Sequence, residues 1–328
     1  MLEEITRVIH EHEKFIISTH VNPEGDAIGS CMALKYLLEH LGKTVWIINT
    51  DPTPEALHFL DPEGCIQVYS AGTSSGVFQK AQVHITVDVN EAARMGEVAG
   101  AVKKSGLVKI ILDHHPPGDH HGEYTCIDPS AAAGGELVGR LYQKMDVPFS
   151  PQAARALYFA LMTDTGGFRF SNTTAETHRL VAELIEAGAD PQELFSAAYE
   201  QGTIERFRLF QKVVATAQFT ADNQIAWMTC TRSFFDETGT SNPDLEDFVN
   251  TPRGLTPVEV SILFSEPNPG KVRISMRSKR QVAVNEIARQ FSGGGHLRAA
   301  GAVFEGTLEQ AQRAVIAAVE QALKQASN

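Results

Sequence analysis

Cysteines are few in this chain of 328 residues, and long apolar runs are lacking. The four cysteines form no CxxC pair and are scattered as Cys31, Cys65, Cys126 and Cys230. No apolar run approaches the ~18 residues that a membrane-spanning helix requires. The N-terminal stretch MLEEITRVIHEHEK is too charged for a signal peptide. We therefore expect no membrane association and a reduced, cytoplasmic setting.

Positive charge is also in deficit. The chain has 28 Lys and Arg against 40 Asp and Glu, a formal net charge of −12. This balance disfavours a protein that coats long or duplex nucleic acid, because phosphate neutralisation supplies most non-specific affinity. The stretch from Lys271 to Arg298 is the exception, with seven basic residues against one acid, Glu286, or +6 in a chain whose remainder carries −18. We expect this stretch to hold a small anion.

The length predicts two domains, since one core seldom grows this large. In the first 190 residues, short apolar runs alternate with amphipathic stretches. The apolar runs are rich in Ile and Val, as expected of strands buried on both faces of a parallel sheet, and cover 14–19, 44–49, 83–88 and 107–113. Helical periodicity marks 27–42, 90–106, 134–145, 151–163 and 174–188. This pattern predicts an α/β domain with helices on both faces of a parallel sheet.

The pattern of apolar and polar residues changes after a polar helical stretch near 190–216. Strands are expected at 223–231, 258–266, 271–278 and 301–306, with helices near 283–291 and 307–325. These strands alternate more, which predicts a smaller mixed-sheet α/β domain. We divide the chain into a metal-binding catalytic domain, a helical linker and a substrate-binding domain with an active-site cleft between the two domains, at 1–190, 191–217 and 218–328.

Residues 18–30, STHVNPEGDAIGS, place His20, Glu24 and Asp26 around a proline and a glycine. Pro23 removes a backbone donor and Gly25 permits positive φ, so the segment reads as a sharp loop that can turn all three side chains inward. In a parallel α/β sheet, ligands bind beyond the carboxyl ends of the strands. Further polar side chains follow such ends or a helix end, namely Asp88, Asp113, His114, His115 and Asp164.

Gathering so many carboxylates is unfavourable unless a cation neutralises them. The mixed oxygen and nitrogen donors exceed what one tetrahedral zinc uses and suit Mn²⁺ or a similar divalent ion. Two ions that share a bridging carboxylate would satisfy the count. The alternative is that each acid caps a helix or is solvated in a loop, a common role for Asp after a strand. The recurrence of such residues at consecutive element ends favours the metal site.

Five segments, in order, resemble the DHH phosphoesterases and in particular their NrnA-like branch of nanoRNases and bisphosphate-nucleotide phosphatases. They are HVNPEGDAIGS at 20–30, TVDV around Asp88, LDHHP at 112–116, TDTGGFRFSNTT at 163–174 and GGGHLRAAG at 293–301. The resemblance implies two Mn²⁺ ions, with Mg²⁺ or Co²⁺ as substitutes. It implies one ion held by His20, Glu24 and Asp88 and the other by Asp26, Asp88, His114 and Asp164.

The same resemblance implies that Asp113 orients a liganding imidazole and that His115 faces the substrate phosphate. The catalytic set is then Asp88, Asp113, His114 and His115. One position departs from the family pattern, because Glu24 stands where the family usually has Asp. Glu is a methylene longer, so metal preference or affinity at that ion is open.

The glycine-rich segment SGGGHLRAAG at 292–301 lets backbone amides approach an anion without hindrance from Cβ atoms. Arg277 and Ser278 end the strand KVRISMRS, where a guanidinium can grip phosphate and a hydroxyl can donate. By resemblance, Arg169 lies nearer the scissile phosphate, and we add Gly294, Gly295 and His296 to the substrate-binding set. The alternatives are a flexible turn and solvated surface arginines.

These features together predict a hydrolase that cleaves short RNA oligonucleotides to mononucleotides, removes the 3'-phosphate of 3'-phosphoadenosine 5'-phosphate, or does both. A second hypothesis is a phosphodiesterase for cyclic or linear dinucleotides such as c-di-AMP and pApA. A third is a nucleotide-binding sensor without catalysis. The resemblance also leaves a homodimer open.

Overall fold

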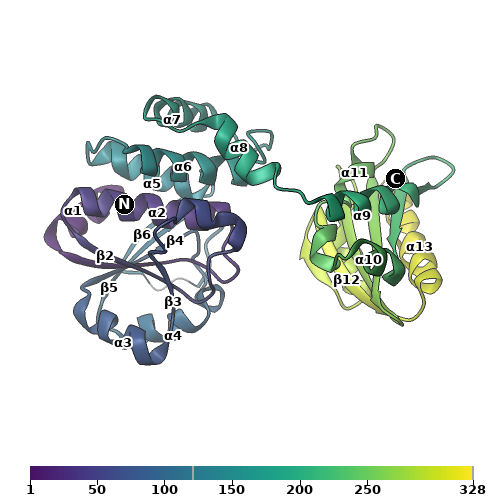
Figure 1. Ribbon diagram of the computed structural model, residues 1–328, viewed down its shortest axis with the longest axis horizontal. Helices are drawn as coiled ribbons and strands as arrows, with labels where there is room; N and C mark the ends of the chain where they lie inside the picture. The colour runs from purple at the N-terminus through teal and green to yellow at the C-terminus, as the bar shows by residue number, and fades with distance from the viewer. Residues whose placement is uncertain (120–121, 327–328) are drawn as a thin grey trace. The chain divides into compact units, whose positions relative to one another are not determined.

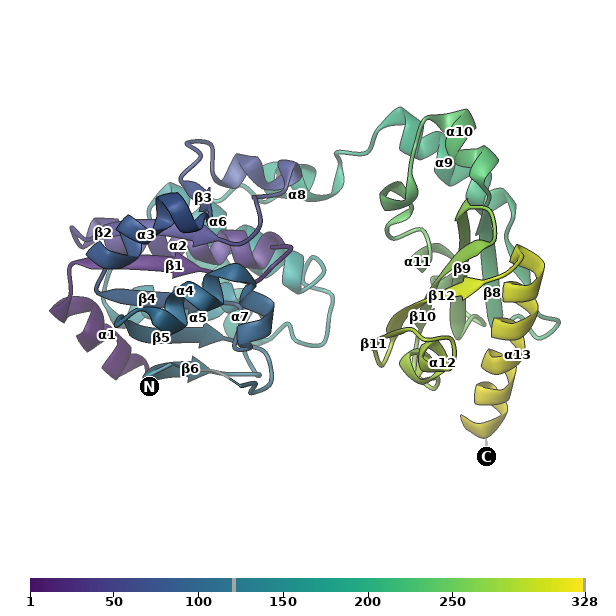
Figure 2. The same cartoon turned by 90° about the horizontal axis from the view of Figure 1, so that it is seen from below.

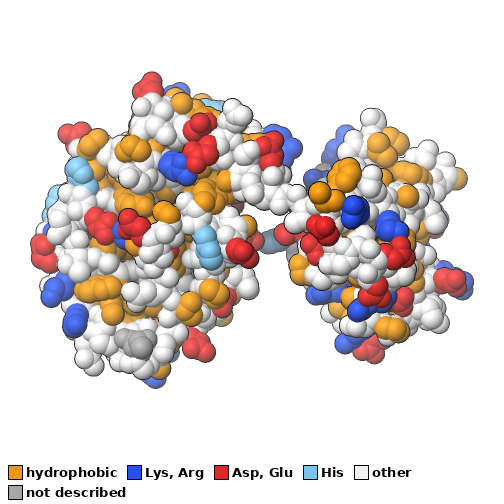
Figure 3. All heavy atoms as spheres, viewed as in Figure 1, with side chains coloured by type: hydrophobic (Ala, Val, Ile, Leu, Met, Phe, Trp, Pro, Cys, Tyr) orange, Lys and Arg blue, Asp and Glu red, His pale blue; other side chains and the backbone are white. Residues whose placement is uncertain are grey.

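The computed structural model describes residues 1–119 and 122–326, and it divides into two compact units, Met1–Gln201 and Gly202–Asn328. Each unit has its own sheet (Figure 1). Among the described residues, no helix combines the length and apolar character needed to cross a bilayer. On the face drawn in Figure 3, acidic and basic side chains are interspersed on both units instead of forming one field of either sign.

The first unit is built on a parallel sheet with the strand order β3-β2-β1-β4-β5-β6. All five residues of the central strand β4 are buried, as expected when helices cover both faces. The strands are β1 Lys14–Ser18, β2 Thr44–Asn49, β3 Ile66–Val68, β4 Val83–Val87, β5 Val108–Asp113 and β6 Tyr124–Ile127.

Helices lie on both faces of this sheet, as predicted (Figures 1 and 2). One face carries α1 Leu2–Glu11, α2 Gly25–His40, α5 Gly134–Lys144 and α6 Pro151–Asp164, with α7 Ala175–Glu186 and α8 Pro191–Tyr199 outside them. The other carries α3 Ala71–Lys80 and α4 Glu97–Lys104, and short 3-10 turns are η1 Glu55–Leu60 and η2 Ala92–Met95.

Helix α2 is the buried centre of the first unit. Most of its residues are buried, because it lies between the sheet and other helices and has no polar stripe. Its glycines allow this close packing: a Cβ on Gly29 would lie 2.5 Å from the backbone oxygen of Ala156 in α6. The tight packing of α2 therefore fixes the position of the loop before it, which contains His20 and Glu24.

The second unit has a mixed sheet of order β11-β12-β10-β9-β8-β7, in which only β8 and β9 pair in parallel among the described strands. Its strands are β7 Gln218–Phe219, β8 Ile225–Cys230, β9 Val260–Asn268, β10 Lys271–Ser278, β11 Gly294–His296 and β12 Ala299–Glu305. The predicted α/β fold class, with a second and mixed sheet, is confirmed.

Two apolar clusters cover the two faces of this second sheet. One joins it to α12 Val284–Gln290 and α13 Leu308–Ala326. The other joins it to α9 Ile204–Ala215, α10 Arg232–Thr238 and η3 Asn242–Leu245, and the short helix α11 Asn250–Arg253 lies near β9. The predicted linker at 191–217 forms α8 and α9, and the division between the units falls between these two helices.

Candidate metal centre

The candidate site lies at the carboxyl edge of the first sheet. His20 follows β1, Asp88 follows β4 directly, and Asp113 is the last residue of β5. Asp26 lies in the first turn of α2, and Asp164 is the last residue of α6. Since parallel strands end at the same edge, the fold brings side chains that are far apart in sequence into one place.

Asp88, at the centre of the cluster, has an unusual backbone conformation. Its φ of 59° lies in the left-handed region that non-glycine residues seldom adopt, at a cost of about 1 kcal/mol. Its amide donates to the carbonyl of Leu112 at 2.9 Å, which ties the turn to β5. A Cβ on Gly134 would lie 3.2 Å from the Asp88 Cβ, so the start of α5 packs directly against this turn.

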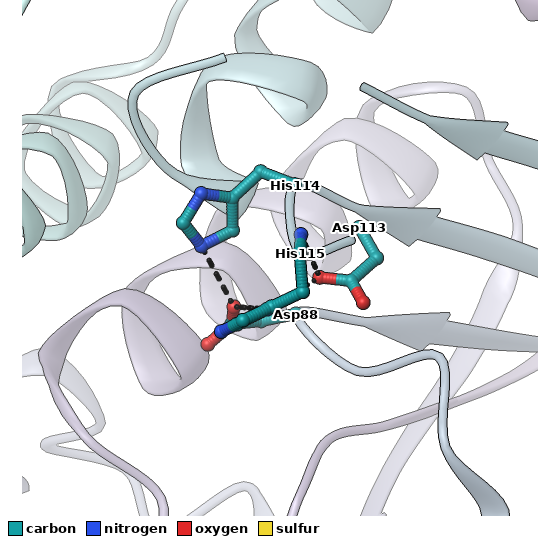
Figure 4. Close-up of side chains that lie close together, drawn as sticks. All are labelled: Asp88, Asp113, His114 and His115. Atoms are coloured by element: carbon teal, nitrogen blue, oxygen red, sulfur yellow. Dashed lines mark hydrogen bonds and ion pairs between the residues drawn. The ribbon is translucent and has the colours of Figure 1, made fainter. Parts of the chain in front are cut away.

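Three imidazoles surround the Asp88 carboxylate. His114 Nε2 lies 3.4 Å and His115 Nδ1 lies 3.5 Å from Oδ1 (Figure 4). His20 Nε2 lies 3.3 Å from Oδ2. The carbonyl of Val21 accepts a hydrogen bond from His20 Nδ1 at 2.7 Å, so in the neutral ring Nε2 keeps its lone pair. That lone pair faces the cluster, as a metal ligand requires.

His114 also faces two further carboxylates. Its Nε2 lies 3.8 Å from Asp26 Oδ2 and 3.7 Å from Asp164 Oδ2. Asp26, His114 and Asp164 each offer one ligand atom within 4.8 Å of the others. The same holds for Asp88, Asp113, His114 and His115. The two groups share His114.

Asp113 contacts the imidazole of His115, and not that of His20 or His114, the two histidines expected to bind metal. Its buried Oδ1 accepts from His115 Nδ1 at 2.8 Å and from the His115 amide at 3.2 Å (Figure 4). His115 is 39% exposed at its side chain, whereas His114 is 12% exposed. Asp113 therefore orients the more exposed ring, the one expected to face substrate.

The amides of two glycines hold Asp26, and the sequence reasoning missed them. Gly134 donates to Oδ2 at 2.6 Å and Gly135 to Oδ1 at 2.9 Å, and the Ser30 hydroxyl donates to Oδ1 at 2.9 Å. These amides open α5, where the helix dipole favours an anion. The signal available in the sequence was the pair Gly-Gly at the start of the helix predicted over 134–145.

Crowding of carboxylates shifts the pKa values in the cluster. Burial raises the pKa of Asp164 to about 6, and burial with the charges of Asp88 and Asp164 raises the pKa of Asp26 well above its usual value. Burial opposes ionisation of Asp88, but contacts with His114 and His20 outweigh it and lower its pKa to about 2. Without a cation, the imidazoles must supply the positive charge that this edge of the sheet requires.

The donor set fits a divalent cation. Asp88 Oδ1 and Asp113 Oδ2 are buried and accept no hydrogen bond from any described residue, so each retains acceptor capacity. Carboxylate oxygens and imidazole nitrogens are ligands that Mn²⁺ accepts, and the groups that could hold an ion contain no cysteine among the residues described.

Glu24 lies beside this cluster, at its exposed rim. It is the N-cap residue of α2, and its negative charge adds to the rise in the pKa of Asp164. Among the described residues, the groups whose ligand atoms lie within 4.8 Å of one another do not include it.

Arg169 is the predicted substrate residue that lies in the first unit. It is exposed, in the turn after α6, and its Nε donates to the carbonyl of Gly166 at 2.6 Å.

The other predicted substrate residues lie in the second unit. Arg277 is half-buried on β10, while Gly294, Gly295 and His296 form β11 and are exposed. A Cβ on Gly295 would lie 2.5 Å from the carbonyl oxygen of Ala299, so the loop needs glycine there. Ser278 is buried, and its hydroxyl donates to the carbonyl of Val282 at 2.6 Å. The structure gives no support to a substrate contact by Ser278.

Two family models match the chain. The model of the DHH family, N-terminal domain, matches residues 14–161, and that of the DHHA1 domain matches residues 222–325. Over 311 residues the chain is 34% identical to the bifunctional oligoribonuclease and PAP phosphatase NrnA of Thermus thermophilus, covering 94% of this chain and 90% of the relative. The chain belongs to the DHH family. As a member it is a metal-dependent phosphoesterase, a hydrolase of phosphoester bonds.

Solved structures of DHH proteins share the fold. An exopolyphosphatase-related protein from Bacteroides fragilis superposes with a TM-score of 0.88 at 30% identity, covering 99% of this chain and 95% of that one. The RecJ protein of Thermus thermophilus in complex with Mn²⁺ superposes with a TM-score of 0.54 at 16% identity, covering 98% of this chain and 55% of that one. The latter likeness concerns the fold alone.

Proposed function

We propose that this DHH protein cleaves short RNA oligonucleotides to mononucleotides and removes the 3'-phosphate of 3'-phosphoadenosine 5'-phosphate. The proposal rests on one observation above all: the buried Asp88 carboxylate faces three imidazoles at the edge of the sheet. The similarity to a relative named as an oligoribonuclease and PAP phosphatase, over nearly the whole chain, supports the choice of substrates.

Two divalent ions, with Mn²⁺ as the first candidate, are the proposed cofactors. His20, Glu24 and Asp88 would hold one, and Asp26, Asp88, His114 and Asp164 would hold the other. When bound, such a pair supplies an activated water as nucleophile and neutralises charge on the phosphate. No protein nucleophile is then required.

The chain's own residues would orient and bind the substrate. Asp113 holds Nδ1 of His115, so Nε2 of that exposed ring is free to face a phosphate oxygen. Arg169 would meet the scissile phosphate, while Arg277, His296 and the amides of the glycine loop would bind the distant part of the nucleotide. Contacts that stabilise the bound substrate and the transition state equally lower KM and leave kcat unchanged.

Asp88→Asn tests the metal centre. It removes the charge shared by the imidazoles, so we expect Mn²⁺ binding, followed by calorimetry, to weaken by more than about tenfold, together with loss of turnover. The matched control is Asp146→Asn, which changes an exposed aspartate in the left-handed region, where asparagine is tolerated. Unaltered Mn²⁺ affinity in Asp88→Asn would contradict the proposed ligand set.

A panel of substrates separates the remaining hypotheses. The parent protein with Mn²⁺ is given an RNA dinucleotide, 3'-phosphoadenosine 5'-phosphate, c-di-AMP and pApA, and released mononucleotide or phosphate is quantified. Preference for c-di-AMP over both the linear RNA dinucleotide and pApA would favour the cyclic-dinucleotide hypothesis. Binding without hydrolysis of any of them would favour the sensor. A homodimer and a cytoplasmic setting stay predictions from the sequence.

A further inference from the structure

The segment between α6 and α7 contains an asparagine, Asn172, that has no part in the proposed ligand and substrate-binding sets. These two helices lie with α5 on one face of the first sheet (Figure 1). The side-chain NH2 group of Asn172 donates to the carbonyl of Ala132 at 2.9 Å and to the carbonyl of Asp164 at 3.2 Å. Its two hydrogens can satisfy both carbonyls at once. Asn172 thus connects the end of α6 with the segment that precedes α5.

The bond to Asp164 supports a proposed metal ligand through its backbone. Asp164 is the last residue of α6, and the carbonyls of the last turn of a helix have no amide of their own helix to bond with. Asn172 supplies the missing donor. Because the carbonyl and the carboxylate belong to one residue, holding the carbonyl restricts where the carboxylate can lie. That carboxylate is one of the three groups that offer ligand atoms within 4.8 Å of one another around His114.

The bond to Ala132 supports a second ligand of the same group. Two residues after Ala132, the amide of Gly134 donates to Asp26 Oδ2 at 2.6 Å, and the next amide, that of Gly135, donates to Oδ1 at 2.9 Å. A Cβ on Gly134 would also lie 3.2 Å from the Cβ of Asp88, so this segment packs against the centre of the cluster. A displacement of Ala132 would therefore move the amides that fix Asp26.

Ala132 is buried and is held at its amide as well as at its carbonyl. The amide donates to Oε2 of Glu136 at 3.1 Å, and the same oxygen accepts from the Thr177 hydroxyl at 2.9 Å. Glu136 and Thr177 are both buried. Thr177 lies in the first turn of α7, five residues after Asn172. Two residues of one short segment therefore fix Ala132, one directly and the other through Glu136.

We propose that Asn172 is a positioning residue for one of the two proposed ions, the one assigned to Asp26 and Asp164. A single side chain ties the end of the helix that carries Asp164 to the amides that orient Asp26, and so sets the separation of the two carboxylates. Their like charges repel when no cation lies between them, so the protein must hold them together before an ion binds. The inference rests on the metal centre of the proposed function and deepens it, because it assigns a role to a residue outside the ligand set.

Asn172→Leu tests this role, because it keeps a side chain of similar size and removes both donor bonds. We expect calorimetry to show that Mn²⁺ binding at one of the two sites weakens by about tenfold, the size usual when a group that supports a metal ligand is lost, and that the other site is unchanged. A second readout needs no metal. In protein treated with a chelator, the amides of Gly134 and Gly135 should exchange their hydrogens about tenfold faster in the variant than in the parent, as followed by NMR.

The matched control is Tyr142→Phe, which removes a buried hydrogen bond from the Tyr142 hydroxyl to the carbonyl of Ala33, at 2.8 Å, elsewhere in the same unit. Like Asn172→Leu, it should lower the free energy of unfolding. Unlike Asn172→Leu, it should leave Mn²⁺ affinity and the exchange of the two glycine amides unchanged. If Asn172→Leu does not fold, Asn172→Ser, whose side chain is too short to reach both carbonyls, takes its place in the same measurements.

Two results would overturn the inference. One is that the variant at position 172 binds both Mn²⁺ ions as tightly as the parent. The other is that it and Tyr142→Phe weaken Mn²⁺ binding equally, since the bonds of Asn172 would then serve stability alone. Failure of the proposed function gives a different result: a parent protein that binds Mn²⁺ and cleaves no member of the substrate panel would refute that function and leave the positioning role intact.

Discussion

His84 makes the stability of the first unit depend on pH in a predictable way. His84 is the second residue of β4 and is 1% exposed. The Ser18 hydroxyl donates to the carbonyl of Ile48 at 2.7 Å, so it accepts from His84 Nε2 at 3.0 Å, and the ring is held in one neutral tautomer. Burial, with the positive charge of Lys109 on the neighbouring strand, lowers the pKa of His84 to about 3.

The sign follows from comparing the two states. In the unfolded chain His84 has a pKa of about 6.5, so below that pH the unfolded chain binds a proton that the folded protein does not. The folded state therefore loses stability as the pH falls. Each pH unit below 6.5 is worth about 1.4 kcal/mol, and the 1.5 units down to pH 5 amount to about 2 kcal/mol. A folded pKa of 3 or of 4 gives nearly the same value, since both lie below pH 5.

His84→Gln removes this titration and keeps an amide donor toward Ser18. We would measure urea unfolding at pH 8 and pH 5, with a chelator present so that metal binding does not contribute. The chain has two tryptophans. Trp46 lies in the first unit and Trp227 in the second, so a Trp227→Phe background makes fluorescence report on the first unit alone.

Between pH 8 and pH 5, the free energy of unfolding of the parent should fall by about 2 kcal/mol more than that of His84→Gln. Other groups that titrate in this range contribute equally to both proteins and cancel in the comparison. Equal losses would mean that His84 is protonated in the folded state, and the reasoning from burial would be refuted.

Two substitutions test the packing that supports the site, both by urea unfolding. Gly29→Ala should destabilise the first unit by about 2 kcal/mol, because its Cβ would meet a backbone oxygen at 2.5 Å, whereas Gly100→Ala, an exposed helical position with open space, should stabilise it slightly. A similar effect at both positions would contradict this. Arg140→Ala should lower the free energy of unfolding by about 3 kcal/mol, because it leaves the buried Glu136 carboxylate without its cation. A decrease below about 0.5 kcal/mol, the size of an ordinary surface effect, would argue against a structural role for this ion pair.

The strands of the first unit could be predicted because burial on both faces leaves a clear mark in the sequence. Four short runs of Ile and Val became β1, β2, β4 and β5, and the polar residues at three of their ends, on β1, β4 and β5, form the cluster. Strands β3 and β6 were not predicted. They lie at the edges of the sheet, where partial exposure weakens the apolar pattern.

Strand alternation in the sequence predicts the orientation of Ser278. In KVRISMRS the apolar residues Val272, Ile274 and Met276 alternate, and Ser278 continues the same series. The period of two places its hydroxyl in the core, where it donates to the carbonyl of Val282. The same period directs Arg277 outward. Proximity in sequence to Arg277, the arginine predicted to bind phosphate, was therefore a weaker guide than strand alternation.

The support of Asp26 could not be predicted, because it depends on a contact over 108 residues of chain. Its two oxygens accept from the amides of Gly134 and Gly135, and no local pattern connects α2 with the start of α5. The same contact gives Asp26 and Glu24 different surroundings. Asp26 is buried, with its oxygens fixed by these amides, so an added methylene would push its carboxylate into α5. Glu24 is exposed at the N-cap of α2, where a longer side chain has room to turn toward the cluster. We therefore expect a Glu at position 24 to have room to reach the proposed metal site, and a Glu at position 26 to disrupt the start of α5.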